Sequence, residues 1–321
     1  MKILRNPHLI SLVAILVFLS FVSVGNFYEH KRLEEIQMCQ AADAALLGAA
    51  FPNLENEIIG KVFYVYNFSK SKKIVGRSEN AAYPLASLTK LMTIRVVLRN
   101  QAEPEMYTVK EEDLNSDNAI GFVAGDTFRV RDLIRAALVG SSNDAAVMLA
   151  HSTGLSEDAF SQVMNIEAKN QNLSSLRFES ATGLDTKENE PTAIGSARDI
   201  AVLLYNNNRD FPLVFADSAL PQTRIAATNG RSIEFESTNH ALGRFDSFIA
   251  GKTGYTISAG GNLAVLWKTE GGDTIAGIVL GSTEEGRFED MVMLHDGTKK
   301  YLASLPQMPT LCKRINYYES N

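Results

Sequence analysis

Three short polar segments occur in this chain in a fixed order, and together they restrict how it can fold. They are Ser87–Lys90 (SLTK), Ser141–Asn143 (SSN) and Lys252–Gly254 (KTG). The first opens an apolar pattern with helical spacing, the second follows a break at Gly140, and the third lies in a run typical of a strand. Each string occurs by chance in other chains, but all three in this order are rare. We therefore expect a helix start, a helix cap and a strand to meet in one cleft.

The first segment is typical of a serine nucleophile activated by a lysine. Ser87 and Lys90 are three residues apart, so on a helix they share a face and the amine can reach the hydroxyl. Keeping Lys90 neutral at pH 7 requires its pKa to fall by roughly 3.4, equivalent to about 4.6 kcal/mol. Burial and a nearby cation both lower a lysine pKa, and Lys252 is the expected cation. The alternatives are a helix cap for Ser87, which is compatible with the nucleophile, and a solvated surface position for Lys90.

The second segment supplies the next two candidate catalytic residues. Ser141 is expected to relay a proton to the leaving amine. Asn143 is expected either to hold a substrate amide or to position Lys90. The alternative for both is a helix cap after the break at Gly140.

The third segment is expected to bind substrate. On an edge strand, Lys252 and Thr253 can bind a substrate carboxylate, and Gly254 leaves room for close approach of a peptide added as a further strand. The backbone N–H groups of Tyr255 and of the nucleophile would form the oxyanion hole. Arg287 is a further candidate for the carboxylate, although a structural ion pair at a helix start is the favoured interpretation of this residue.

Composition and charge exclude several other classes of protein. The 321 residues are 45% hydrophobic and carry a net charge of -6 from 31 basic and 37 acidic residues, so a globular body is expected and nucleic-acid binding is disfavoured. The chain contains no H-E-x-x-H metal motif, no Walker loop and no dinucleotide fingerprint. We therefore predict an enzyme without a metal or another cofactor.

The N-terminus indicates transport out of the cytoplasm. Lys2 and Arg5 precede an apolar run from Leu9 to Val24. As a helix this run would cover about 24 Å, against a hydrocarbon core of roughly 30 Å. We predict a retained membrane anchor in residues 1–28, with a signal peptide cleaved after Gly25 as the alternative, and a helical linker at 29–57. The expected location is the cytoplasmic membrane with an extracytoplasmic catalytic domain, or export if the segment is cleaved.

The two cysteines, Cys39 and Cys312, cannot form a C-x-x-C metal or redox motif. In an oxidising compartment they could form a disulfide that joins the two ends of the chain, worth up to about 5 kcal/mol. Two unpaired thiols are the equally weighted alternative.

The hydrophobic periodicity indicates an α/β (α+β) fold. An antiparallel sheet assembled from both ends of the chain is expected in a catalytic domain at 58–303, flanked by helices, with an inserted helical subdomain at about 103–245 and a C-terminal tail at 304–321. Strands are predicted at 61–68, 74–75, 249–253, 261–269 and 274–280, and helices at 34–49, 87–100, 130–139, 143–151, 159–169, 197–205 and 287–302.

Several longer stretches resemble one family, the serine D-alanyl-D-alanine carboxypeptidases of bacterial cell walls, or low-molecular-mass penicillin-binding proteins of the β-lactamase/transpeptidase-like superfamily. The stretches are 84–93 (PLASLTKLMT), 130–150, 164–165 (MN), 182–185 (TGLD), 196–199 (SARD), 238–240 (TNH) and 251–256 (GKTGYT). The resemblance implies the penicillin-recognising fold and a covalent acyl-enzyme on Ser87 that water resolves. It also implies peptidoglycan peptides ending in D-Ala-D-Ala as substrates and β-lactam antibiotics as covalent inhibitors.

Four alternatives to a carboxypeptidase are weighed against it. A D,D-endopeptidase acting on peptidoglycan cross-links belongs to the same family. A class A β-lactamase shares the three segments, but Glu190-Pro191 lacks the asparagine expected four residues after the glutamate, so Glu190 is interpreted as a solvated loop residue. A non-catalytic wall-binding protein is disfavoured because every catalytic side chain is present. A Ser-His-Asp hydrolase has little support, since no G-x-S-x-G occurs.

Overall fold

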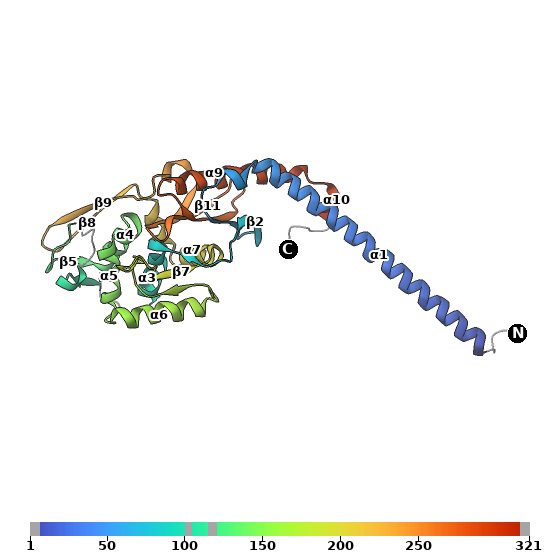
Figure 1. The fold of residues 1–321 in the computed structure, drawn as a ribbon, viewed down its shortest axis with the longest axis horizontal. Helices are drawn as coiled ribbons and strands as arrows, with labels where there is room; N and C mark the ends of the chain where they lie inside the picture. The colour runs from blue at the N-terminus through green and yellow to red at the C-terminus, as the bar shows by residue number, and fades with distance from the viewer. Residues whose placement is uncertain (1–6, 100–104, 115–120, 315–321) are drawn as a thin grey trace. The chain divides into compact units, whose positions relative to one another are not determined.

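The computed structural model describes residues 7–99, 105–114 and 121–314, which fall into two compact units (Figure 1). The larger unit is Phe51–Lys299, and the smaller combines Met1–Ala50 with Lys300–Asn321. All three characteristic segments lie in the larger unit.

The centre of the larger unit is a five-stranded antiparallel sheet with the strand order β10-β11-β12-β1-β2. Its first strand in sequence, β1, pairs with its last, β12, in a register that places Val62 opposite Leu280. The prediction of an antiparallel sheet built from both ends of the chain is therefore confirmed. The strands are β1 (Val62–Asn67), β2 (Lys72–Arg77), β10 (Phe248–Thr256), β11 (Gly260–Lys268) and β12 (Thr274–Ser282).

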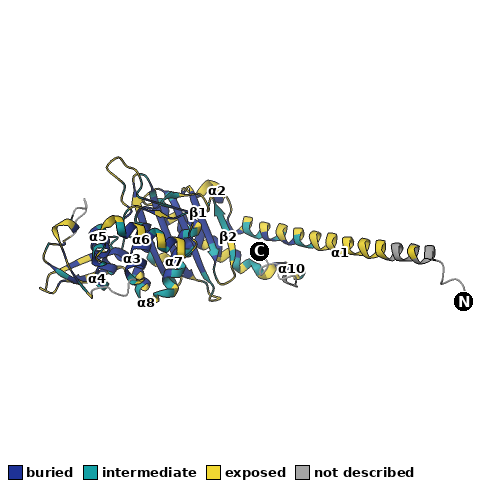
Figure 2. Ribbon diagram, turned by 90° about the horizontal axis from the view of Figure 1, so that it is seen from below, coloured by how far each residue is buried: buried dark blue, intermediate teal, exposed yellow. Residues whose placement is uncertain are grey.

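Helices cover this sheet, so the central strands are buried on both faces (Figure 2). Helix α7 packs on β1, β11 and β12. On α9, Met291 lies so close to Gly277 of β12 that a Cβ at position 277 would be 2.7 Å from its sulfur. The α-helices of this unit are α2 (Leu54–Glu57), α3 (Lys90–Arg99), α4 (Val130–Val139), α5 (Asn143–Ser152), α6 (Glu157–Asn170), α7 (Ala197–Asp210) and α8 (Pro212–Phe215), and α9 (Gly286–Ser304) continues into the smaller unit.

The middle of the chain is less uniformly helical than predicted. The region 103–245 contains two hairpins, β4 (Met106–Thr108) with β5 (Thr127–Arg129) and β8 (Gln222–Ala226) with β9 (Ser232–Glu236). In the second hairpin exposed and buried residues alternate, and Ile225, Ile233 and Phe235 point into the core. The same region contributes β6 (Arg177–Phe178) and β7 (Ala193–Gly195) to a small sheet with β3 (Tyr83–Pro84). The shorter 3₁₀ turns are η2 (Ala86–Thr89), η3 (Glu111–Asp113), η4 (Ala216–Ala219), η5 (Leu242–Arg244) and η6 (Leu305–Gln307).

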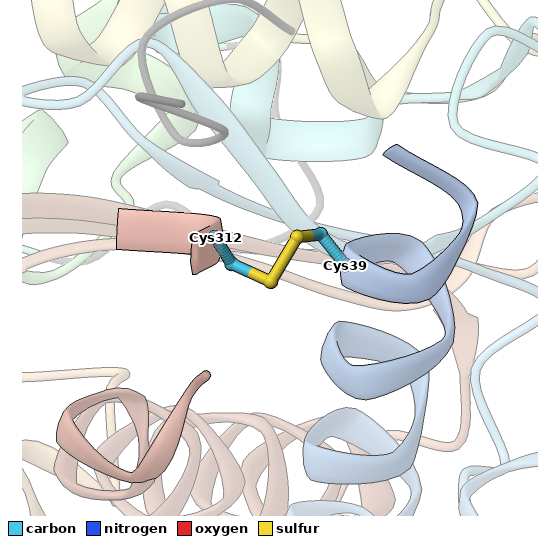
Figure 3. Close-up of a disulfide and its surroundings, with 2 residues drawn as sticks. All are labelled: Cys39 and Cys312. Carbon is cyan, nitrogen blue, oxygen red and sulfur yellow. A yellow bond between two sulfur atoms is a disulfide. The ribbon is translucent and has the colours of Figure 1, made fainter. Parts of the chain in front are cut away.

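The smaller unit contains α1 (Pro7–Ala50) and α10 (Thr310–Arg314), joined by a disulfide between Cys39 and Cys312 (Figure 3). Their Cα atoms are 5.5 Å apart, within the range that a disulfide spans. Of the two alternatives left open by the sequence, the structure therefore contains the disulfide and not the two free thiols. Helix α1 is continuous where the sequence predicts a separate anchor and linker, and the predicted tail includes η6 and α10.

No helix in the part of the chain that the structure describes has both the length and the apolar content needed to cross a membrane. The membrane anchor in residues 1–28 stays a prediction. Residues 1–6 of that segment, and the side chains of residues 7–10 and 12–17, lie outside the description.

Candidate active site

Ser87 lies in a tight turn at the entrance of helix α3. The sequence predicts a regular helix from this residue, but the structure has the 3₁₀ turn η2, followed by α3 from Lys90. Ala86 has a φ of 48°, in the left-handed region that is strained for a residue other than glycine. Neighbouring contacts hold this conformation, since Thr89 Oγ1 donates to the Ala86 carbonyl at 2.7 Å. The start of the turn is fixed by Asn262, whose Nδ2 donates to the Pro84 carbonyl at 2.9 Å.

Lys90 is fully buried and its amine has three oxygen neighbours. Its Nζ lies 2.7 Å from Ser87 Oγ, 2.8 Å from Asn143 Oδ1 and 3.0 Å from the Thr182 carbonyl oxygen. A neutral amine has two N–H donors and one lone pair. Because Asn143 Oδ1 and the Thr182 carbonyl can only accept, they take both donors, and the lone pair is left for the hydroxyl proton of Ser87.

Burial lowers the pKa of Lys90 from 10.5 to about 7, so a large share of the amine is neutral near neutral pH. The depression corresponds to about 5 kcal/mol against the charged form. The sequence analysis assigned part of this effect to a cation at Lys252, whereas burial is the cause that the structure identifies. The electrostatic interaction between the two lysines affects the pKa of Lys252 instead. Burial, and then the charges of Lys90 and Arg287, hold that pKa well below its usual value.

The second segment forms the sharp connection between α4 and α5. Gly140 ends α4 where a Cβ would lie 2.5 Å from the Phe235 ring, so a larger residue does not fit. Ser141 then adopts a φ of 54°, and the Ser142 hydroxyl caps α5 by accepting from the N–H of Ala145 at 3.2 Å. Helix α5 begins at Asn143, so the helix cap and the site residues share this connection.

The third segment lies on β10, the edge strand of the large sheet, whose residues contact η2. Lys252 is buried and its Nζ donates to Ser141 Oγ at 2.7 Å and to the Thr253 carbonyl at 2.9 Å. Gly254 permits the close approach of the two elements, because a Cβ there would lie 2.9 Å from the Leu85 carbonyl and 3.1 Å from the Ser87 nitrogen. The strand thus packs directly against the nucleophile turn.

The two remaining substrate-binding candidates flank this strand. Arg287 is 5% exposed and its Nη1 donates to the Gly254 carbonyl at 2.7 Å. Among the described residues it forms no ion pair within 4.0 Å, in contrast to the structural salt bridge favoured by sequence, and its Nε has no hydrogen-bond partner. Tyr255 is 46% exposed beside the nucleophile turn. Its backbone role in an oxyanion hole stays a prediction.

Sequence reasoning missed three residues that shape the site. The Thr182 carbonyl binds Lys90, Asn262 anchors the turn before Ser87, and Thr238 Oγ1 lies 2.6 Å from Thr253 Oγ1. Thr182 and Thr238 belong to stretches that resemble the carboxypeptidase family, which was the available signal. No side-chain pattern identifies a backbone carbonyl as a ligand of a lysine.

Comparison with known proteins agrees with this geometry. The family model for D-alanyl-D-alanine carboxypeptidases matches residues 54–284. The carboxypeptidase DacD of Salmonella typhimurium is 29% identical over 266 residues, which cover 78% of this chain and 64% of that protein. A D-alanyl-D-alanine endopeptidase of Haemophilus influenzae is 28% identical over 227 residues, or 69% of this chain and 75% of that protein. The chain thus spans less than two thirds of the DacD relative.

Solved structures give the same result for the fold. Penicillin-binding protein D2 of Listeria monocytogenes, in its ampicillin-bound form, is 30% identical with a TM-score of 0.65, covering 75% of this chain and 98% of that chain. A penicillin-binding protein homologue from Mycobacterium tuberculosis, at 23% identity and a TM-score of 0.68, shows the fold alone and covers 78% of this chain and 93% of that chain. The penicillin-recognising fold predicted from the sequence is confirmed, and the chain belongs to the D-alanyl-D-alanine carboxypeptidase family.

Proposed function

We propose that this protein is a serine D,D-carboxypeptidase, which removes the terminal D-alanine from peptidoglycan stem peptides through an acyl-enzyme on Ser87. The observation that carries the proposal is the buried amine of Lys90, 2.7 Å from Ser87 Oγ, with two other oxygens that take its N–H donors. This arrangement provides a base for the hydroxyl proton near neutral pH without a histidine.

In acylation, Ser87 Oγ attacks the carbonyl carbon of the penultimate D-alanine while its proton moves to Lys90 Nζ. The oxyanion forms beside the N-terminal end of η2 and α3, where the N–H groups of Ser87 and Tyr255 are the proposed donors. The peptide C–N bond then breaks and the leaving amine takes up a proton. Water later attacks the ester carbon and gives a proton back to the group that protonated the leaving amine. The Lys90 ammonium returns its proton to Ser87 Oγ as the ester bond breaks, which releases the shortened peptide and restores the serine hydroxyl.

The second lysine gives a route for the proton that the leaving amine requires. Lys252 Nζ donates to Ser141 Oγ, so a proton can pass from the ammonium through the hydroxyl to the amine. The charge of Lys90 is one of the causes that lower the pKa of Lys252. Protonation of Lys90 in the first step therefore favours release of the proton from Lys252 in the next.

The substrate carboxylate is proposed to lie beside Thr253 of β10. The hydroxyls of Thr253 and Thr238 meet there at 2.6 Å, and Arg287 lies behind Gly254 with its Nε unpartnered among the described residues. A cationic guanidinium and two hydroxyls suit the carboxylate of a terminal D-alanine.

β-Lactam antibiotics are proposed as covalent inhibitors, in keeping with the ampicillin-bound and cefotaxime-bound forms of the Listeria relative. The first test is the intact mass of the protein after incubation with penicillin. We expect an added mass of one antibiotic on the wild type and none on Ser87→Ala. Labelling of the alanine variant would reject the nucleophile. The second test is release of free D-alanine from a muropeptide ending in D-Ala-D-Ala.

A D,D-endopeptidase is the second candidate. It is considered because the relatives of this chain include the D-alanyl-D-alanine endopeptidase of Haemophilus influenzae, which is 28% identical over 227 residues. Cleavage of cross-linked muropeptide dimers without release of D-alanine from monomers would select this function. For the β-lactamase alternative, Glu190 lies exposed in its loop, as the sequence analysis expected.

We further propose that the catalytic domain works outside the cytoplasm. Lys2 and Arg5 before an apolar run resemble an export signal, and the bond between Cys39 and Cys312 is typical of an oxidising compartment. Protection of the domain from protease in intact cells would contradict this location.

A further inference from the structure

The loop at 180–192 lies directly on the nucleophile turn. Its Thr182 carbonyl accepts from Lys90 Nζ at 3.0 Å, and its Ala181 carbonyl accepts from Thr93 Oγ1 at 2.6 Å. A Cβ at Gly183, which has a φ of 75°, would lie 2.0 Å from the Ala86 carbonyl oxygen. The position of this loop therefore determines where one of the acceptors for the Lys90 amine stands.

Asp185 ties this loop to the turn after β10. Its Oδ2 accepts from the backbone N–H of Ser258 at 3.0 Å, and its Oδ1 accepts from Ser258 Oγ at 2.6 Å. The carboxylate is partly buried, so hydrogen bonds to it are less exposed to competition from water than on an open surface. Within β10, Gly254 abuts the Ser87 nitrogen. The nucleophile turn contacts the 180–192 loop, the loop contacts the turn after β10, and β10 contacts the nucleophile turn.

We propose that Asp185 is a positioning residue for acylation, which, by binding Ser258, holds the Thr182 carbonyl in place on the Lys90 amine. This inference rests on the proposed function, because it concerns the step in which Lys90 takes the Ser87 proton. Asp185 does not touch the reacting atoms. Its effect passes through the loop and fixes the direction of the amine lone pair.

Loss of the hydrogen bonds between Asp185 and Ser258 has two measurable consequences. An amine with one acceptor displaced can rotate away from Ser87, so the rate constant of acylation falls while reversible binding of the antibiotic is preserved. The ammonium form also loses a carbonyl acceptor, so the pKa of Lys90 falls further and the acidic limb of the pH–rate profile moves to lower pH. The other groups facing Lys90 are Ser87 Oγ on η2 and Asn143 Oδ1 on α5, with Lys252 on β10 interacting electrostatically with it, and none of them is altered by the changes below.

The test is stopped-flow acylation by penicillin from about pH 5 to about pH 9, which separates the acylation rate constant from the dissociation constant. We expect Asp185→Ala to lower the rate constant roughly 10- to 100-fold with the dissociation constant unchanged. Ser258→Ala removes one hydrogen bond and no charge, and we expect a smaller loss and a shift of the acidic limb in the same direction. The double variant should be no slower than Asp185→Ala, because both changes cut the same link.

Glu188→Ala is the matched control, since it removes a carboxylate from an exposed position of the same loop. Rate constants and acidic limbs equal to the wild type in both Asp185→Ala and Ser258→Ala would overturn the inference, as would strictly additive losses. If Asp185→Ala does not fold, Ser258→Ala decides the outcome alone. Absence of any acylation of the wild-type protein at Ser87 would instead reject the proposed function.

Discussion

Replacement of Lys90 by methionine is predicted to change the pH dependence of stability in a direction that the site geometry fixes. Burial holds the pKa of Lys90 at about 7 in the folded protein, against 10.5 for the ordinary side chain. Between these values the unfolded chain carries a proton at this lysine that the folded protein does not. The free energy of unfolding of the wild type therefore rises with pH across this window, and Lys90→Met removes that rise.

The two pKa values set how steeply the difference in unfolding free energy between the wild type and Lys90→Met changes with pH. Each pH unit between about 7 and 10.5 contributes about 1.4 kcal/mol, so the wild type should gain between 2 and 3 kcal/mol on Lys90→Met, roughly, from pH 7 to pH 9. Methionine also leaves Asn143 Oδ1 and the Thr182 carbonyl without their donor, at about 1 to 3 kcal/mol for each buried group. That penalty does not titrate in this window. The slope, and not the absolute difference, is therefore the test.

Urea unfolding of both proteins at about pH 7, 8 and 9 gives the required free energies. Lys187→Met is the control, because it makes the same replacement at an exposed position of the 180–192 loop. We expect its difference from the wild type to stay flat with pH. If the stability curves of the wild type and Lys90→Met run parallel over this range, the amine is not held neutral by burial and the proposed base loses its physical basis.

Three further changes test other parts of the structure. Gly183→Ala should abolish acylation by penicillin with the fold retained in circular dichroism, since its Cβ would lie 2.0 Å from a carbonyl oxygen of the nucleophile turn. The double replacement Cys39→Ser and Cys312→Ser should lower stability by at most about 5 kcal/mol in thermal unfolding and leave acylation unchanged, because the site lies wholly within 51–299. The hydrogen bond that the His151 ring donates to the Asp113 carboxylate raises the pKa of His151. We therefore expect His151→Ala to cost most stability below about pH 6.5 and less as pH rises through the folded pKa; a pH-independent loss in thermal unfolding would contradict this.

The sequence predicted the parts of the fold that have long, periodic patterns. The strands at 249–253, 261–269 and 274–280 correspond to β10, β11 and β12, and helices at 130–139 and 143–151 correspond to α4 and α5. What it missed are strands of two to five residues, which are too short to show a period against the surrounding helices. Those short strands matter for the site, since β3 leads into the nucleophile turn and is held by β7.

The side chains of the site were predictable, but the backbone that aims them was not. Ser87 and Lys90 come together as their spacing predicts, and Asn143 contacts Lys90, in keeping with one of the two roles expected of it. The left-handed conformations of Ala86 and Ser141 have no local signature, because neither residue favours a positive φ by itself.

Such strain persists only where tertiary contacts enforce it, and these contacts come from segments far along the chain. Gly183 packs on the Ala86 carbonyl, Asn262 binds the residue that leads into the turn, and Gly254 closes on the nucleophile nitrogen. Two of these three residues are glycines, which matter here because they lack a side chain. In a sequence, a glycine is first interpreted as a turn residue and not as a packing contact. The three motifs therefore name the reacting groups, whereas the direction in which Ser87 and Lys90 face each other depends on residues that carry no chemistry of their own.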